Sequence, residues 1–378
     1  MAEYFNNIGD MLRYFYGAKD VAKTDAPVLT STSGVYNPVF GAQAFSQLNN
    51  EANAFGILPK YPWQKSGWRV ITADAGTTAA GGVAESGAMP DSIKPTFVEV
   101  STKPKQVVHT FQVSMIHDGL VKKGDDNIGD MEFLRGYFAT LHAKRINEQL
   151  LADAATAQAG NNFESIDRVT ANYAMIAAFS ITANYLDIYG VDRDAGASWA
   201  DAVVSHASGT DRVLTMDLIR DTLSTLENNG ARTNVLLTGN DTKYRIFGIA
   251  DSQVRYHGVV QKDVLVQIGI NGVQTAEGIN AGVRVATVYG IPLFSSQAVQ
   301  QDTISRIYLL DTTIQEGTGI PRLGIAMLFP TLYFESGMSA SDKNPFAINY
   351  TGSKGAYYTA GELICTFFKA QGSIRDLK

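Results

Sequence analysis

Cysteine is almost absent from this sequence, since Cys365 is the single one among 378 residues. One cysteine excludes an internal disulfide and leaves a cysteine-rich metal site without ligands. Cys365 stands in the apolar run ELICTFFKA, where a free cysteine packs as a small hydrophobe. We therefore interpret Cys365 as a buried strand residue and not as a nucleophile.

Clusters of Lys and Arg are also missing, and the formal net charge is −6. A tight nucleic-acid site needs clustered cations that neutralise phosphates. No stretch reaches the roughly 18 uninterrupted apolar residues that a membrane span requires, and the N-terminus lacks the basic start and apolar core of a secretory signal. The sequence thus predicts a soluble protein of intracellular origin, with no membrane segment and no sequence-specific grip on nucleic acid.

Motifs of known catalytic or cofactor chemistry are absent as well. The sequence has no Gly-x-Ser-x-Gly elbow, no phosphate loop, no dinucleotide fingerprint and no histidine pair at metal spacing. The spacing of Asp192, Asp194 and Gly196 resembles the start of a calcium loop, but the later acidic ligands are missing. We assign no catalytic, cofactor-binding or metal-binding residue, and we expect a protein that is not an enzyme.

What the sequence does contain is a long hairpin with an oversized tip. Trp68 to Thr72 reads as a strand. On the expected way out, polar partners alternate with Val107, His109, Phe111, Val113 and Met115, and His117 follows. The stretch between them, which includes GGVAESGAMPDSIKPTFVEV, is much longer than the usual loop of about two to five residues. Such a tip is typical of a functional loop that another molecule orders.

A long helix follows the hairpin, predicted from Asp130 to about Thr156 and therefore about 40 Å long. Acidic residues open it, and Leu134, Phe138 and Leu141 form an apolar stripe at helical spacing. We interpret its segment HAKRINEQ, residues 142–149, as the solvated face.

Residues 160–212 are mixed and rich in turn formers, and an αβα pattern begins at Thr215. It comprises a helix to Asn228, a buried strand TNVLLTG and a helix from Asp241, with Asn240 as its cap. Further strands are predicted at 283–288, 293–295, 306–310, 325–334 and 357–370. A composition of 45% hydrophobic and 18% charged residues is that of an ordinary folded protein. The succession of helices and strands then predicts an α+β fold.

The order of these parts resembles a known family. An extended arm, the hairpin GVAESGAMPDSIKPTFVEVSTKPKQVVHTFQVS, the acidic break KKGDDNIGD and the helix FLRGYFATLHAKRINEQLLADA are similar to the major capsid protein of tailed double-stranded DNA viruses, with the Hong Kong 97-like fold. The segments VLLTGNDTKYRI, VYGIPLFSSQAV, RIYLLDTT and GELICTFFKAQGSIRDL agree with the second domain and the return strand of that family. The resemblance covers most of residues 30–378.

The resemblance implies a domain organisation. The parts are an N-terminal arm (1–60), the extended hairpin loop with its flanking strands (61–116), a peripheral domain with its spine helix (117–159), an insertion (160–212), an axial domain (213–345) and the return strand of the peripheral domain (346–378). The hairpin would lie over a neighbouring subunit, so its hinge and tip would be contact residues: Gly81, Gly82, Glu85, Gly87, Asp91 and Lys94. Glycine allows the loop to change curvature at low steric cost.

The resemblance also implies partners and a location. The chain would assemble with itself into pentamers and hexamers of an icosahedral virion, be made in the host cytoplasm, and enclose double-stranded DNA without reading its sequence. A separate scaffold, a portal and decoration proteins are further expected partners. Some members crosslink a loop lysine to an asparagine of a neighbour, and here the candidates are Lys94 with Asn344 or Asn349.

Three alternatives stay open from the sequence. An encapsulin-like nanocompartment shell resembles the same fold but holds enzyme cargo, with a cargo-docking helix expected where this chain places an extended arm. A ligand-binding or adhesin module would leave the hairpin ordered in the monomer. An enzyme whose residues come from distant segments is the third.

Overall fold

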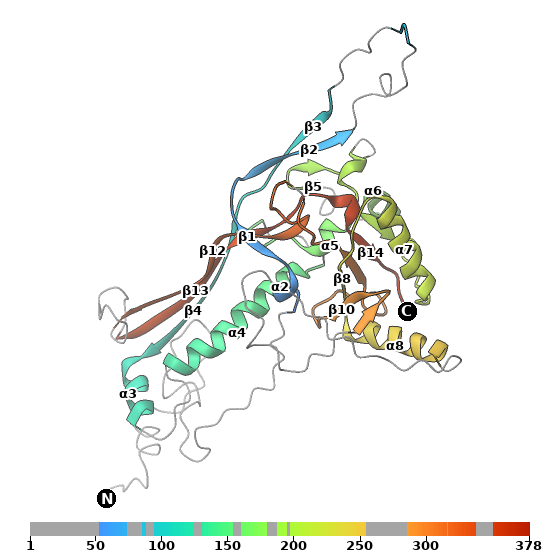
Figure 1. Cartoon of the computed structure of the whole chain (residues 1–378). Coiled ribbons are helices and arrows are strands. Elements are labelled where there is room, and N and C mark those ends of the chain that lie inside the picture. Colours follow the sequence, from blue (N-terminus) through green and yellow to red (C-terminus); the bar gives the residue numbers. More distant parts are fainter. Residues whose placement is uncertain are drawn as a thin grey trace, which may run out of the picture. The chain divides into compact units, whose positions relative to one another are not determined.

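The computed structural model has a mixed α and β architecture (Figure 1). The chain divides into two compact units. The described part of unit 1 lies within Gln106–Ile146 and Phe329–Ala360, and that of unit 2 within Glu51–Lys105, Asn147–Leu328 and Gly361–Lys378. The structure describes residues 53–73, 85–87, 94–123, 131–153, 160–179, 187–194, 197–254, 286–315, 317–337 and 351–378. This architecture confirms the predicted α+β class.

The helices are α2 (Asn53–Ile57), α3 (Met115–Lys123), α4 (Met131–Leu150), α5 (Ile166–Val169), α6 (Tyr173–Phe179), α7 (Met216–Asn228), α8 (Asn240–Val254) and the 3-10 turns η2 (Ser198–Ala200) and η4 (Phe368–Ala370). The strands are β1 (Lys60–Pro62), β2 (Gly67–Ala73), β3 (Thr96–Ser101), β4 (Lys105–Ser114), β5 (Asp187–Ile188), β6 (Val191–Asp192), β7 (Val203–Ser205), β8 (Val235–Thr238), β9 (Ala286–Val288), β10 (Ile291–Ser295), β11 (Ile307–Leu310), β12 (Leu323–Gly337), β13 (Gly352–Cys365) and β14 (Gly372–Ile374).

Unit 1 is built from α4 and a sheet in which β4 lies beside β13 and β13 beside β12. The alternation of β4 buries Val107, Phe111 and Val113 on one face, as the period of a strand requires. Phe111 stacks on Phe138 of α4 with ring centroids 4.8 Å apart, and Leu134 belongs to the same buried cluster. The predicted apolar stripe of the helix therefore packs on the alternating strand.

The helix α4 is shorter than predicted, because it ends at Leu150 and so extends about 30 Å. The last turn tightens where the Ala152 N–H donates to the Gln149 carbonyl. The Gln300 side-chain amide then donates a hydrogen bond to the Leu151 carbonyl at 2.9 Å. A side chain from a distant segment thus satisfies a free carbonyl after the helix end, which the local pattern does not encode.

The prediction that HAKRINEQ is the solvated face was wrong. His142 and Asn147 are each about 1% exposed, whereas Arg145 is exposed. His142 bonds to other side chains of unit 1, and in unit 2 the Asn147 side chain accepts the Phe55 N–H at 3.2 Å. Polar residues are buried here because tertiary partners satisfy them.

The predicted exit strand of the hairpin was also wrong. β2 pairs antiparallel with β3, while the strand that holds Val107 and Phe111 is β4 in the sheet of unit 1. The hairpin closes where the Thr102 N–H donates to the Ser66 carbonyl at 2.8 Å, and Pro104, which has no N–H to donate, follows. Both strands alternate in the same way, so the pattern alone does not choose the partner of β2.

Unit 2 contains a six-stranded sheet in the order β7-β14-β11-β8-β10-β9, in which all four residues of β8 are buried. Leu236 pairs with Leu293 of the parallel β10 and with Leu309 of the antiparallel β11. In the same unit, β1 pairs in parallel with Ile325–Met327 of β12. The buried strand TNVLLTG is therefore confirmed as a central strand.

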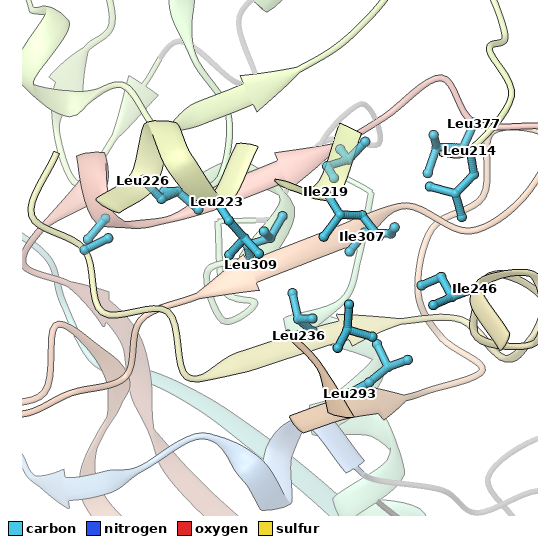
Figure 2. Close-up of a cluster of buried hydrophobic side chains, with 14 residues drawn as sticks. Leu214, Ile219, Leu223, Leu226, Leu236, Ile246, Leu293, Ile307, Leu309 and Leu377 are labelled. Carbon is cyan, nitrogen blue, oxygen red and sulfur yellow. The ribbon is translucent and has the colours of Figure 1, made fainter. Parts of the chain in front are cut away.

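The helix α7 lies where a helix was predicted, and it packs on part of this sheet. Thr215 caps its first turn by accepting the Leu218 N–H, and Gly230, at φ +80°, ends it by a bond to the Glu227 carbonyl. Its buried residues Ile219, Leu223 and Leu226 follow the helical period. Figure 2 shows these side chains meeting those of the strands in one core: Leu214, Ile219, Leu223, Leu226, Leu236, Ile246, Leu293, Ile307, Leu309 and Leu377.

Two predicted boundaries shift. α8 starts at Asn240, the residue predicted as its cap, and extends to Val254, while β13 ends at Cys365 before the η4 turn.

None of the helices in the described part of the chain has both the length and the apolar composition needed to cross a membrane.

Candidate functional site

The predicted contact residues lie in and beside the tip that joins β2 to β3. Glu85, Gly87 and Lys94 are exposed. The other predicted residues, Gly81, Gly82, Asp91, Asn344 and Asn349, lie outside the described residues. The hinge and the Lys94 crosslink therefore stay predictions, and the described strands next to the tip are those of the β2–β3 ribbon.

The antiparallel ribbon of β2 and β3 (Figure 1) has two faces that differ in burial. Trp68 lies opposite the buried Val100, on the face that is more buried. The neighbouring pair on the other face joins Arg69 to Glu99 by an ion pair of 3.0 Å between side chains that are each more than 70% exposed. Such an exposed pair is worth about 1 kcal/mol or less.

Next along the same outer face is a pair of exposed apolar side chains. Ile71 lies directly opposite Phe97, and they are 61% and 48% exposed. Complete burial of a side chain of this size contributes about 1.5–3 kcal/mol, of which these two residues forgo about half in the isolated chain. Contiguous exposed apolar surface is typical of a contact site for another molecule.

Aromatic side chains of unit 2 hold the base of the ribbon. The Trp68 and Tyr189 rings meet edge to face with centroids 5.3 Å apart, and the Tyr189 hydroxyl donates to the Leu363 carbonyl at 2.7 Å. Tyr189 also contacts Phe368, on which the guanidinium of Arg193 lies. The base is thus fixed by packing while the outer face of the ribbon is free of such contacts within the described residues.

Two hollows flank the ribbon. One, of about 410 Å³, lies between Val70–Thr72 and residues 366–369, and the other, of about 570 Å³, is lined by Tyr61, Trp68 and Ile364 among others. The buried indole N–H of Trp68 has no hydrogen-bond partner among the described residues. The ribbon is therefore not packed down along its whole length.

The buried charges of unit 2 form a structural network. Asp167, which is fully buried, accepts bonds from Tyr308 at 2.9 Å and Arg306 at 3.2 Å and pairs with Arg375 at 2.9 Å. Burial lowers the pKa of Arg306, but Asp167, Tyr308 and Asp302 together outweigh burial, and the net pKa is raised. Burial and then Asp167 raise the pKa of the Tyr308 hydroxyl. Arg306 thus stays a cation and Tyr308 a neutral phenol, and the network joins α5 to β11.

Other titratable groups are also explained by packing. Burial raises the pKa of Cys365 to about 12, so its thiol is protonated and the prediction of a packed strand residue is confirmed. Burial likewise raises the pKa of Glu362 to about 8. The Asp194 carboxylate accepts the Ala197 N–H at 2.8 Å. The described residues hold no group of three or more His, Cys, Asp or Glu placed to bind a metal.

Comparison with known proteins relates this geometry to a fold. No family model matches the sequence, and no curated protein matches it. The capsid asymmetric unit of cyanophage A-1(L) matches 90% of this chain and 97% of its own, with a TM-score of 0.61 and 16% identity. The capsid of a native GTA particle matches 88% and 92%, with a TM-score of 0.50 and 12% identity. The SrpI encapsulin complex of Synechococcus elongatus PCC 7942 matches 100% and 97%, with a TM-score of 0.48 and 11% identity.

The chain has the Hong Kong 97-like capsid fold. The resemblance of the sequence to this fold is therefore confirmed.

Two exposed features of this chain were missed in the sequence. One is the Ile71–Phe97 pair, and the other is an aromatic group in unit 1, where Phe329 and Phe334 of β12 both contact Tyr358 of β13 at ring distances of 6.1 and 6.4 Å. Phe329 and Phe334 are 45% and 55% exposed. A signal for the first was present, because adjacent apolar residues in VI and FV place apolar side chains on both faces of a strand.

Proposed function

We propose that this chain is the major capsid protein of a tailed double-stranded DNA virus, a subunit that assembles with its own copies into a closed icosahedral shell. The observation that carries the proposal is the match in fold over 97% of a cyanophage capsid chain. A fold alone does not specify a function, so the surface of this chain has to support assembly independently.

The ribbon gives that support. Its base is anchored by Trp68 and Tyr189, while Ile71 and Phe97 on the outer face lack cover within the described residues. In the proposed shell this face packs on a neighbouring copy, with Glu85, Gly87 and Lys94 of the tip reaching the same neighbour. The exposed aromatic group of Phe329, Phe334 and Tyr358 is a second surface for contact between copies.

The charge of the chain fits a container. A net charge of −6 with no clustered cations suits a wall that encloses DNA without binding it tightly. The proposed roles follow the sequence bounds: arm 1–60, hairpin loop 61–116, peripheral domain 117–159, insertion 160–212, axial domain 213–345 and return strand 346–378. A separate scaffold, a portal and decoration proteins are the proposed partners, and the virion is the proposed location.

Electron microscopy of the chain expressed in a bacterial host tests the proposal. We expect rings or closed shells, and particles purified from a producing virus should contain nuclease-protected DNA. Closed shells that hold protein cargo and no DNA would replace the proposal by the encapsulin-like alternative. A chain that sediments as a stable monomer at all concentrations and salts would exclude both.

A further inference from the structure

Two histidines meet inside unit 1, where no catalytic or binding role was assigned to them. His109 of β4 and His142 of α4 approach with their Nδ1 atoms 2.8 Å apart, and their rings lie at 85° to one another. His142 is 1% exposed and His109 is half-buried. The contact joins the long helix directly to the strand beneath it.

A chain of hydrogen bonds continues from this pair. The Nε2 atom of His142 lies 2.7 Å from the Thr359 hydroxyl of β13, which in turn lies 2.9 Å from the Thr331 hydroxyl of β12. Both nitrogens of His142 are therefore engaged. A neutral imidazole has one donor and one acceptor nitrogen, so two neutral rings satisfy both contacts with complementary tautomers.

Protonation changes this balance. One added proton makes both nitrogens of a ring donors, and a second puts two N–H groups and two positive charges against each other at the Nδ1–Nδ1 contact. The contact therefore tolerates one proton beyond the two that the neutral rings carry, and a second added proton breaks it. The geometry of the contact thus opposes the uptake of a second added proton.

The charged groups around the pair do not relieve this. Arg145, on the same helix, adds a positive charge, and the Arg135 guanidinium is already paired with Glu335 and bonded to Tyr333 of β12. From β13 the neutral Tyr357 ring lies 6.1 Å from His142, and its hydroxyl donates to the Arg135 carbonyl. Among the described residues of these elements, the Glu335 carboxylate is thus held by Arg135 and Tyr333.

We propose that the His109–His142 pair is an acid-sensitive contact that holds α4 on the sheet of unit 1 only while the pair remains neutral or singly protonated. The inference does not depend on the proposed function, because it concerns the stability of one unit.

The pKa values agree in direction with the geometry. Burial, and then the neighbouring His109, lower the pKa of His142 from 6.5 to about 4. Burial and then Arg145 lower the pKa of His109. At these histidines the folded state binds protons more weakly than the unfolded state. The stability that the pair contributes to unit 1 is therefore fully present above pH 6.5 and is lost as the pH decreases toward 4. At pH 5, the lowered pKa of His142 makes the equilibrium constant for opening the contact about thirtyfold larger than it is when His142 is neutral in both states.

Hydrogen exchange with mass spectrometry on the full chain tests this between pH 7.5 and 4.5. Peptides of α4 and β4 are compared with peptides of α7 in the same sample, so that the pH dependence of chemical exchange cancels. In the natural chain we expect α4 to lose protection relative to α7 by tenfold or more between pH 7 and pH 5. The double substitution His109→Gln and His142→Gln should abolish most of this loss, since an amide donates and accepts without titrating. His206→Gln, a histidine of unit 2, is the matched control and should behave as the natural chain.

If the natural chain shows no selective loss in α4, or the double variant shows the same loss, the proposal is wrong. Should the double variant fail to fold at pH 7.5, His109→Gln alone decides, because His109 is only half-buried. This variant removes the site of the second added proton. Its loss of α4 protection in acid must therefore be smaller than that of the natural chain, and an unchanged loss overturns the proposal.

Discussion

At the scale of single residues, the sharpest constraint in unit 1 is a glycine in a strand. A Cβ on Gly355 would lie 2.6 Å from the Phe111 ring and 2.9 Å from the Tyr333 hydroxyl, both closer than real contacts allow. Gly136 of α4 has open space around it. The same substitution should therefore have opposite effects in the same unit.

Gly355→Ala should lower the stability of unit 1 by about 1–3 kcal/mol because it overpacks the aromatic cluster. Gly136→Ala should raise stability by up to about 1 kcal/mol because alanine favours the helix. Hydrogen exchange of β4 and α4 peptides measures both. An unchanged stability of the Gly355→Ala variant would mean that Phe111 is free to move away from β13.

The buried carboxylate of Asp167 gives a second residue-scale prediction, this time in unit 2. Asp167→Asn leaves the buried Arg375 and Arg306 with less compensating charge, so we expect a loss of about 3–5 kcal/mol. Asp221→Asn, at a side chain 74% exposed, is the matched control and should change stability by less than about 0.5 kcal/mol. The three tryptophans, Trp63, Trp68 and Trp199, all lie in unit 2, so their fluorescence during denaturant unfolding reports the difference. Equal losses in both variants would contradict the network.

At the scale of elements, the β2–β3 ribbon separates folding from assembly. Ile71 and Phe97 are exposed, so replacing both by Ser should change the stability of the isolated chain by no more than about 0.5 kcal/mol for each. Assembly should nevertheless fall strongly, because the apolar area proposed to pack on a neighbour is lost.

The yield of sedimenting particles, beside thermal unfolding of the unassembled chain, measures the two effects. Tyr244→Ser on α8, at a side chain 70% exposed, is the control for loss of an exposed aromatic residue and should assemble normally. Normal shells from the Ile71→Ser, Phe97→Ser variant would remove the ribbon face from the proposed contact surface.

At the scale of the whole molecule, the proposed shell requires one chain to fit positions of different curvature. The sequence places Gly81 and Gly82 in the tip, where glycine tolerates backbone angles that other residues avoid. The double substitution Gly81→Pro, Gly82→Val should leave folding nearly intact, since loop tips contribute few core contacts. Assembly should instead give uniform rings, tubes or aberrant shells.

Thermal unfolding together with micrographs of the products distinguishes these effects. Normal closed shells from this variant, with hairpins that superimpose at every position, would show that flexibility is not the reason for those glycines.

Local patterns determined much of what could be predicted. The cap at Thr215, the periodic apolar residues of α7 and the stop at Gly230 all act within a few residues, so the helix was predictable almost to its ends. The same holds for the buried strand β8 and for Cys365, because runs of apolar residues lose free energy in water wherever they are placed. The order of such elements was enough to indicate the capsid fold.

Only the tertiary structure decided which elements are partners. β3 and β4 have similar alternation, and a strand pattern sets the face of a side chain but not the neighbour of the strand. His142 and Asn147 looked like residues of a solvated face, yet partners more than 30 residues away in the sequence satisfy them and allow their burial. Polar burial depends on hydrogen bonds that close only in three dimensions, whereas apolar burial follows from the side chain itself.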